Sequence, residues 1–326
     1  MQTLNKDLFI SEISGRIKAI NPSTVKGIGD DAAVLGYGKT LQLFSTDSLL
    51  EGIHFDLMYV PVKHLGYKSA IAGFSDIYAM NGSPKQIMVS IAVSSKCSQE
   101  WVTQLYEGIE LACAEYGADL VGGDISASIT GTVINISVIG EVLPDKIVYR
   151  NGMQDGDLIC VSGELGGAYL GLQILEREKR LFEKNEGFKP VLDGYDYVIG
   201  RQLRPSARKD IISFFNDEGI RPTAMIDISK GLVPDLKSLC SSSELGCKLY
   251  EHKIPLDDES LKVASELNQS PYVAAMYGGQ DYELLFSVPV GDYDKILKNG
   301  DISILGHAIA ESNEVMLFSE SGDAVL

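Results

Sequence analysis

The chain has 326 residues and a formal net charge of −17, and its length predicts two domains because single hydrophobic cores rarely grow this large. The acidity argues against binding to nucleic acid, which needs Lys and Arg against the phosphates. Five scattered cysteines without a CxxC pair, four histidines without zinc-ligand spacing and no run of about 18 apolar residues predict a cytoplasmic protein without disulfides, zinc or a membrane anchor.

The N-terminal half of the chain alternates between strand and helix patterns. Apolar residues recur at helical spacing over residues 62–80. A second helix is expected to be capped by Ser98, to run to residue 115 and to end at Gly117. Strands are predicted over residues 40–45, 86–94, 119–122 and 132–142. This alternation is typical of an α/β fold.

The polar, turn-rich segment 144–157 is the predicted boundary between a domain of residues 1–145 and one of residues 146–326. The second half has the same α/β character. Strands are predicted over 158–162, 223–228, 283–288 and 302–305, and helices at the start of GELGGAYLGLQIL and over 206–218 and 232–241. The polar stretch 177–193 is predicted to be an excursion from the fold.

The sequence AVLGYGKT, residues 33–40, ends like a phosphate-binding P-loop. However, Ala33 replaces the first glycine of that motif, and the residues that follow form a strand where a P-loop requires a helix. We therefore interpret Gly36 to Gly38 as a hairpin turn. The glycine-rich GELGGAYLG could cradle a phosphate, but such a corner is more often ordinary packing.

Six aspartates are predicted to lie where apolar runs end in turns made of small residues. They are Asp30 and Asp31 in GIGDDAAVL, Asp47 in LFSTDSLLEGIHF, Asp76 in GFSDIYAM, Asp124 in LVGGDIS, and Asp227 in AMIDISKGL. One such aspartate is usually a local cap, but several that converge would repel one another without a cation. Oxygen ligands suit Mg²⁺, which typically bridges carboxylates to substrate phosphates. The set therefore indicates a magnesium site for phosphoryl transfer, with ligands from both halves of the chain.

The motifs also occur in a recognisable order. GIGDDAAVL, STDSLLEGIHF, FSDIYAMNGSPKQIMVS, LVGGDIS, IDISKGL and GGQDYELLF follow one another as in thiamine-monophosphate kinases. The chain resembles this family, whose superfamily includes aminoimidazole ribonucleotide synthetase, selenophosphate synthetase and the hydrogenase-maturation dehydratase. The resemblance implies a homodimer of two-domain α/β subunits with mixed sheets of the α+β type. It also implies Mg²⁺-dependent transfer of the γ-phosphoryl of ATP to thiamine monophosphate, giving thiamine diphosphate and ADP.

The resemblance also assigns roles to residues of this chain. The implied metal ligands are Asp30, Ser45, Thr46, Asp47, Asp76, Asp124 and Asp227, with Asp31 in a supporting role. The implied ATP contacts are Tyr106, Gly123, Asp124, Arg150, Ser229 and Lys230, and the implied contacts to thiamine monophosphate are His54 and Gln280. No residue is expected to act covalently, because transfer between phosphates depends on positioning and charge neutralisation. From the residues alone, His54 could equally be a turn residue, Tyr106 helix packing and Arg150 a solvated linker residue.

The chain departs from the family pattern at three places. Lys230 replaces a carboxylate of the usual DISDGL, Gln280 replaces the acid of GGEDYELL, and the chain finishes SESGDAVL without the usual aromatic residue. We hypothesise that the Lys230 ammonium takes the place of one peripheral Mg²⁺ and contacts phosphate directly. Two alternatives stay open: a kinase-like homologue with weak or altered activity, and a non-catalytic dimer that binds phosphorylated ligands.

Overall fold

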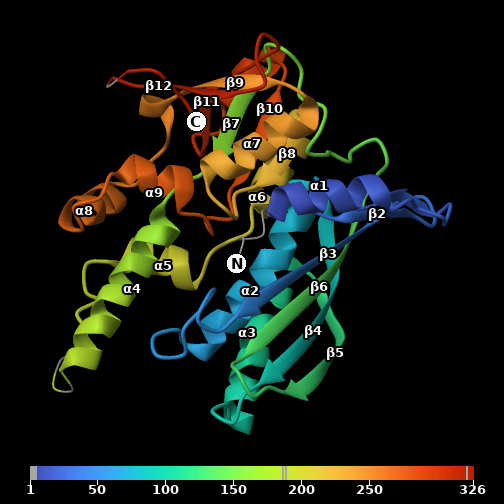
Figure 1. The fold of residues 1–326 in the computed structure, drawn as a ribbon. Coiled ribbons are helices and arrows are strands. Elements are labelled where there is room, and N and C mark those ends of the chain that lie inside the picture. Colours follow the sequence, from blue (N-terminus) through green and yellow to red (C-terminus); the bar gives the residue numbers. More distant parts are fainter. Residues whose placement is uncertain (1–5, 186, 188, 321) are drawn as a thin grey trace.

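Two mixed β-sheets, one from each half of the chain, form the frame of the molecule (Figure 1). The computed structural model describes residues 6–185, 187, 189–320 and 322–326. The first sheet has the strand order β1-β2-β3-β6-β4-β5 and is antiparallel except for the β4–β5 pair. Its strands are β1 (Thr24–Lys26), β2 (Ala33–Gly36), β3 (Leu41–Leu50), β4 (Ser83–Val93), β5 (Asp119–Ala127) and β6 (Val133–Val142).

The second sheet has the order β13-β12-β9-β11-β7-β10-β8, and β9 and β12 are its parallel pair. Its strands are β7 (Leu158–Ser162), β8 (Ala224–Asp227), β9 (Gly246–Tyr250), β10 (Leu284–Val288), β11 (Ile302–Ile309), β12 (Val315–Phe318) and β13 (Ala324–Val325). Two mixed sheets with helices packed on them confirm the predicted α/β fold of the α+β type.

The helices include two long ones on the first sheet and a group around the second (Figure 1). They are α1 (Lys6–Arg16), α2 (Val62–Ala79), α3 (Gln99–Tyr116), α4 (Gly167–Lys184), α5 (Asp196–Leu203), α6 (Lys209–Glu218), α7 (Leu232–Ser243), α8 (Asp258–Glu266), α9 (Pro271–Tyr277) and α10 (Tyr293–Ile296). The single-turn 3₁₀ helices are η1 (Glu251–Lys253) and η2 (Val290–Asp292). Among the described residues, no helix combines the length and apolar character needed to cross a bilayer.

Helix α2 is buried along nearly its whole length and links the two sheets. It packs on β3 and β6 of the first sheet and also contacts β8 of the second. Phe74 of α2 and Phe286 of β10 belong to one continuous apolar core. The two halves thus share a core, and the division at residue 145 stays a prediction.

The close approach of α2 and α3 depends on two glycines. A β-carbon at Gly66 of α2 would lie 2.0 Å from the carbonyl oxygen of Leu105, and one at Gly108 of α3 would lie 2.0 Å from that of Lys63. Ser98 begins α3 as predicted, since its hydroxyl accepts a hydrogen bond from the Trp101 amide at 3.1 Å. Gly117 ends the helix with a φ of 75°. The hairpin predicted at Gly36 to Gly38 is also confirmed by the antiparallel pairing of β2 with β3.

Three of the aspartates do not lie in turns after strands, so that part of the sequence interpretation was wrong. Asp47 lies inside β3, Asp76 inside α2 and Asp124 inside β5. Strand β3 continues past residue 45 because its side chains alternate between buried and more exposed positions and its backbone pairs with ten residues of β6. The polar residues Ser45, Thr46 and Asp47 therefore belong to a long strand.

Two predicted boundaries in the second half were also wrong. The predicted excursion 177–193 begins inside α4, which continues to Lys184 because the helix keeps a buried stripe that includes Ile174 and Glu178. The Glu178 carboxylate is itself satisfied by the Arg177 guanidinium and the Val191 amide. The helix predicted from residue 206 begins only at Lys209.

Replacing Gly66 by alanine is expected to reduce the free energy of unfolding by about 1–3 kcal/mol, because the added methyl group collides with the α3 backbone. Gly200→Ala in α5 is the matched control, since a β-carbon there meets nothing within 4 Å and alanine favours a helix by up to about 1 kcal/mol. Urea unfolding of both variants provides the measurement. Equal stability of Gly66→Ala and wild type would contradict the close contact.

Candidate active site

Three carboxylates from different elements meet where α2 passes between the two sheets. Asp31 precedes β2, Asp76 lies in α2 and Asp227 ends β8. Each offers a carboxylate oxygen, and the three oxygens lie within 4.8 Å of one another. Asp47 of β3 is a close neighbour: burial raises the pKa of its carboxyl group, and a hydrogen bond with Asp76 offsets part of that rise.

The surrounding elements fix the orientation of these carboxylates. The Ser75 hydroxyl donates a hydrogen bond of 2.8 Å to Asp227 Oδ2, which ties α2 to the end of β8. Ser45 lies on the face of β3 that packs against α2, where its hydroxyl donates to the Gly73 carbonyl oxygen at 3.3 Å. The carboxylates are thus held by packed elements of both sheets, as a pre-organised site requires.

Arg150 is paired with this cluster through Asp31. Its guanidinium forms a two-point ion pair with Asp31, with Nε donating to Oδ2 at 3.1 Å. Its backbone amide donates to the Asp30 carboxylate at 3.3 Å, and Lys26 Nζ lies 2.6 Å from Asp30 Oδ2. Of the two adjacent aspartates, Asp31 therefore faces the cluster, while Asp30 holds the chain that carries Arg150.

The carboxylates have unusual acidities because they are buried together. Desolvation raises the pKa of Asp31, Asp76 and Asp227, and repulsion between their charges raises it further, whereas Arg150 lowers it. Such a group of buried acids favours a divalent cation, which would replace the missing hydration and neutralise the charge. The all-oxygen donor set fits Mg²⁺.

A cavity of about 640 Å³ adjoins the cluster through Arg150. It lies between α1 and α7, and Lys230 and Lys237 add further positive charge to its wall. The loop that carries Lys230 is shaped by Asp235, whose Oδ2 accepts a hydrogen bond of 2.9 Å from the Lys230 amide. A cationic cavity beside a carboxylate cluster can hold a polyphosphate whose end reaches the metal site.

Several of the other predicted site residues lie on the face of the first sheet that turns away from α2. Thr46 is exposed there, with its hydroxyl 3.3 Å from that of Ser137. Asp124 pairs in register with Ser90, and both are exposed, so Asp124 points away from the cluster within one subunit. Its neighbour Gly123 is also on the exposed edge strand β5.

The remaining predicted residues lie on separate elements, and the contacts of Tyr106 and His54 do not involve the carboxylate cluster. Tyr106 is half-buried on α3 and borders a cavity of about 470 Å³ shared with β5. His54 follows β3, where its Nδ1 accepts a hydrogen bond of 3.0 Å from the Leu50 amide. Ser229 follows β8, and its carbonyl oxygen accepts from the Gln280 amide at 2.9 Å. The structure thus brings Gln280 next to the segment that ends in Lys230.

Comparison with known proteins decides the family. Residues 29–142 match the family model of AIR synthase related protein, N-terminal domain. The thiamine-monophosphate kinase of Aquifex aeolicus is 34% identical over 277 residues, which are 85% of this chain and 85% of the relative. That of Bacillus subtilis is 30% identical over 282 residues, 83% of this chain and 82% of the relative. The chain belongs to the thiamine-monophosphate kinase family.

Solved structures agree with this membership. The structure of AaThiL complexed with AMPPCP and TMP has a TM-score of 0.82 and 29% identity, covering 100% of this chain and 99% of that chain. E. coli HypE, a hydrogenase maturation protein, has a TM-score of 0.65 at 17% identity, covering 99% and 97%, and shares the fold. The aminoimidazole ribonucleotide synthetase-like fold inferred from motif order is therefore confirmed.

Two residues of this kinase-family site were underrated or missed from the sequence. Asp31 was given a supporting role, yet its carboxylate is part of the three-residue cluster. Asp235 was not singled out, although burial and the nearby charge of Asp227 together raise its pKa to about 7. Its position three residues into a helix that follows IDISKGL was the available signal, because an acid there can bind the preceding loop amides.

The stabilisation by Mg²⁺ is expected to depend on pH. In the metal-free protein the cluster carboxylates have pKa values above their unfolded values, so their contribution to stability is present at low pH and is lost as pH rises. Mg²⁺ binds the deprotonated carboxylates. We expect Mg²⁺ to stabilise the protein by about 2–3 kcal/mol at pH 8 and by less than about 1 kcal/mol at pH 5.

Thermal unfolding with and without MgCl₂ at the two pH values measures this effect. Asp76→Asn should remove most of the Mg²⁺ shift at pH 8, whereas Asp217→Asn, at an exposed position on α6, should keep it. A Mg²⁺ shift of the same size at both pH values would argue against a site made of these carboxylates.

Proposed function

We propose that this protein transfers the γ-phosphoryl group of ATP to thiamine monophosphate in a Mg²⁺-dependent reaction that gives thiamine diphosphate and ADP. The observation that carries the proposal is the cluster of Asp31, Asp76 and Asp227 beside a cavity lined by Arg150 and Lys230. Family membership supports the substrates, since AaThiL was solved with AMPPCP and TMP. A cytoplasmic location is proposed with this biosynthetic role.

In this proposal the aspartates bind the metal ion, and Arg150 and Lys230 contact the phosphates. Asp31, Asp76 and Asp227 would hold Mg²⁺, with Asp47 beside them, and Mg²⁺ when bound neutralises the charges that separate two phosphate chains. Arg150 keeps Asp31 oriented and offers its remaining N–H groups at the cavity wall. Lys230, at the same wall, supplies a point charge for phosphate where the family pattern has a carboxylate.

We also propose that two copies of the chain form a homodimer through the face of the first sheet that turns away from α2 and α3. That face presents Phe44 and Met88, and the adjoining edge strand β5 presents Val121 and Ile125, all more than one third exposed. Figure 1 shows the two long helices on the other face only. An exposed apolar sheet face with an open edge is typical of a subunit contact. Asp124 and Gly123 lie there too, so a dimer would bring the second subunit to these predicted ligands.

The activity is tested by incubating the protein with ATP, Mg²⁺ and thiamine monophosphate and measuring thiamine diphosphate. Asp227→Asn is expected to lower kcat by about 10²–10³-fold, because it removes a carboxylate from the centre of the cluster. The control Asp217→Asn should retain wild-type kcat. Absence of thiamine diphosphate from the wild-type reaction would favour the kinase-like homologue with altered activity. If the protein also failed to bind ATP, both the thiamine-monophosphate kinase and the kinase-like homologue would be excluded.

The dimer is tested by size-exclusion chromatography with light scattering. Met88→Glu places a charge on the open sheet face and is expected to shift the protein to a monomer, because a buried unpaired charge costs several kcal/mol. Leu261→Glu changes a similarly exposed apolar residue on α8 and should leave the mass unchanged. A monomeric wild-type protein, or a dimeric Met88→Glu variant, would contradict this interface.

A further inference from the structure

Lys68 is a buried cation without a carboxylate partner among the described residues. It lies on α2, is 4% exposed, and donates hydrogen bonds to the Gln202 carbonyl oxygen at 2.8 Å and to Gln280 Oε1 at 2.6 Å. Buried lysines are rarely found unless paired. Both acceptors here are neutral, and one of them is the amide that replaces the acid of the family motif.

The loop that carries Gln280 has a strained backbone. Gln280 and Tyr282 are non-glycine residues with φ values of 60° and 53°. Such conformations cost of the order of 1–3 kcal/mol each and persist only where surrounding contacts impose them. Backbone hydrogen bonds of 2.9 Å from Gln280 to Ser229 and from Tyr282 to Ile228 hold the loop against the end of β8. Strained loops held in this way are common at binding sites.

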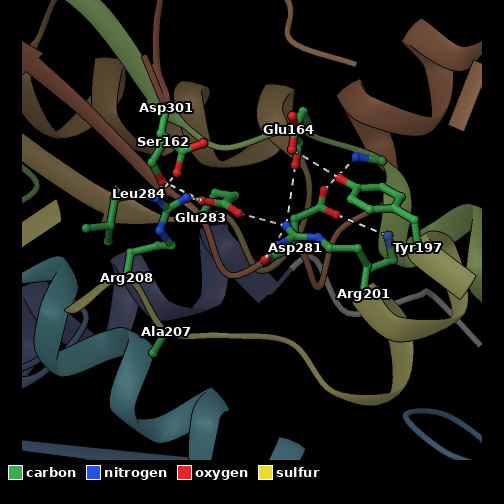
Figure 2. Close-up of polar contacts among 12 residues, drawn as sticks. Ser162, Glu164, Tyr197, Arg201, Ala207, Arg208, Asp281, Glu283, Leu284 and Asp301 are labelled. Carbon is green, nitrogen blue, oxygen red and sulfur yellow. Dashed lines mark hydrogen bonds and ion pairs between the residues drawn. The ribbon is translucent and has the colours of Figure 1, made fainter. Parts of the chain in front are cut away.

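A second set of contacts holds the other side of the loop (Figure 2). Asp281 accepts hydrogen bonds from the amides of Gly166 and Ala168 at the start of α4. Arg201 donates to the Asp281 carbonyl oxygen at 3.0 Å and to Glu283 Oε1 at 2.8 Å.

Glu283 also accepts from Arg208 and from the Ser162 hydroxyl (Figure 2). This network fixes the loop backbone and the side chains of Asp281 and Glu283. Among the described residues, Lys68 is the hydrogen-bond partner of the Gln280 side chain.

We propose that Lys68 is a positioning residue that holds the Gln280 side chain in the conformation that binds the phosphate acceptor. The proposal rests on the proposed function and on the contact to thiamine monophosphate that the family resemblance assigns to Gln280. Lys68 acts from α2, the helix that also carries Asp76, so the metal cluster and the acceptor loop are fixed to the same rigid element. The neutral amide of Gln280 gives the ammonium no charged hydrogen-bond partner, whereas the acid of the family motif could pair with it.

This arrangement makes acceptor binding sensitive to pH. Burial lowers the pKa of Lys68 to about 7, and the Asp281 carboxylate opposes that shift. The other titratable or charged groups on these elements are Lys63, His64, Tyr67, Asp76 and Tyr78 on α2, Asp196, Tyr197, Arg201 and Arg204 at α5, and Tyr282 and Glu283 in the loop. The neutral amine that forms above pH 7 is a weaker hydrogen-bond donor than the ammonium. The hydrogen bond from Lys68 to Gln280 therefore weakens as pH rises.

The contribution of Lys68 to the stability of the fold changes with pH in the opposite direction to the strength of its hydrogen bond with Gln280. Because the pKa of Lys68 is lower in the folded than in the unfolded state, the folded protein binds fewer protons between pH 7 and the ordinary lysine pKa of 10.5. The Lys68 contribution to stability therefore increases as pH rises through this window. In Gln280→Glu a carboxylate would keep Lys68 charged, and this increase should disappear.

Steady-state kinetics of Lys68→Met and Gln280→Glu test the proposal. Lys68→Met is expected to raise KM for thiamine monophosphate by about 10–100-fold, with kcat and the KM for ATP changed by less than about threefold, because it removes a charged hydrogen bond from the acceptor loop alone. In wild type, KM for thiamine monophosphate should rise from pH 6.5 to pH 8.5, and in Gln280→Glu that rise should be absent. An unchanged KM in Lys68→Met, or equal losses for both substrates, would overturn the proposal.

Thermal unfolding between pH 6.5 and pH 10 separates this proposal from the proposed function. The difference in Tm between Gln280→Glu and wild type should shrink as pH rises, and Lys68→Met should show no such pH-dependent difference from Gln280→Glu. If wild type makes no thiamine diphosphate but the Tm pattern holds, the proposed function fails and the acceptor role with it, while the Lys68–Gln280 contact stands. If the Tm differences do not change with pH, the contact itself is refuted.

Discussion

Repulsion among buried carboxylates is the constraint on which the rest of this structure depends. Asp31, Asp76 and Asp227 bring oxygens within 4.8 Å of one another, and the structure pairs one guanidinium, that of Arg150, with them. Like charges at such distances interact strongly once water is excluded. The chain can hold them only because the α2 helix and both sheets are packed around them. Such a group of buried carboxylates favours a cation, whose binding would stabilise the folded protein.

Elements from both halves of the chain hold these mutually repelling carboxylates in place. Helix α2 packs against α3 through the close contact at Gly66 and also lies on the first sheet, and Ser75 on the same helix is hydrogen-bonded to Asp227 at the end of β8. Because Asp76 and Lys68 share that helix, the carboxylate cluster and the Gln280 loop are attached to one element. Transfer between two phosphate chains depends largely on positioning, which such a shared element favours.

Sequence reasoning succeeded where the signal was local or carried by motif order. The cap at Ser98 and the hairpin after Gly36 depend on a few adjacent residues, and the order of the aspartate motifs was sufficient to identify the family. It failed where distant residues decide. Which of two adjacent aspartates faces the cluster is fixed by an arginine 119 residues away, and the Lys68–Gln280 contact spans 212 residues. The continuation of β3 through Asp47 depends on pairing with β6, and the polar residues Ser45, Thr46 and Asp47 give no sign of that pairing.

The departures from the family motifs at Lys230 and Gln280 both remove a negative charge. Relative to the family motifs, a carboxylate becomes an ammonium at the cavity wall, and an acid beside the buried Lys68 becomes an amide. Both changes make the surroundings of the phosphates more positive without altering Asp31, Asp76 or Asp227. Protein cations attract a phosphate without a bridging metal, but as point charges they orient it less strictly than a metal held by fixed carboxylates. The carboxylate cluster is therefore unchanged, while the two altered positions change the charge at the cavity wall and beside Lys68.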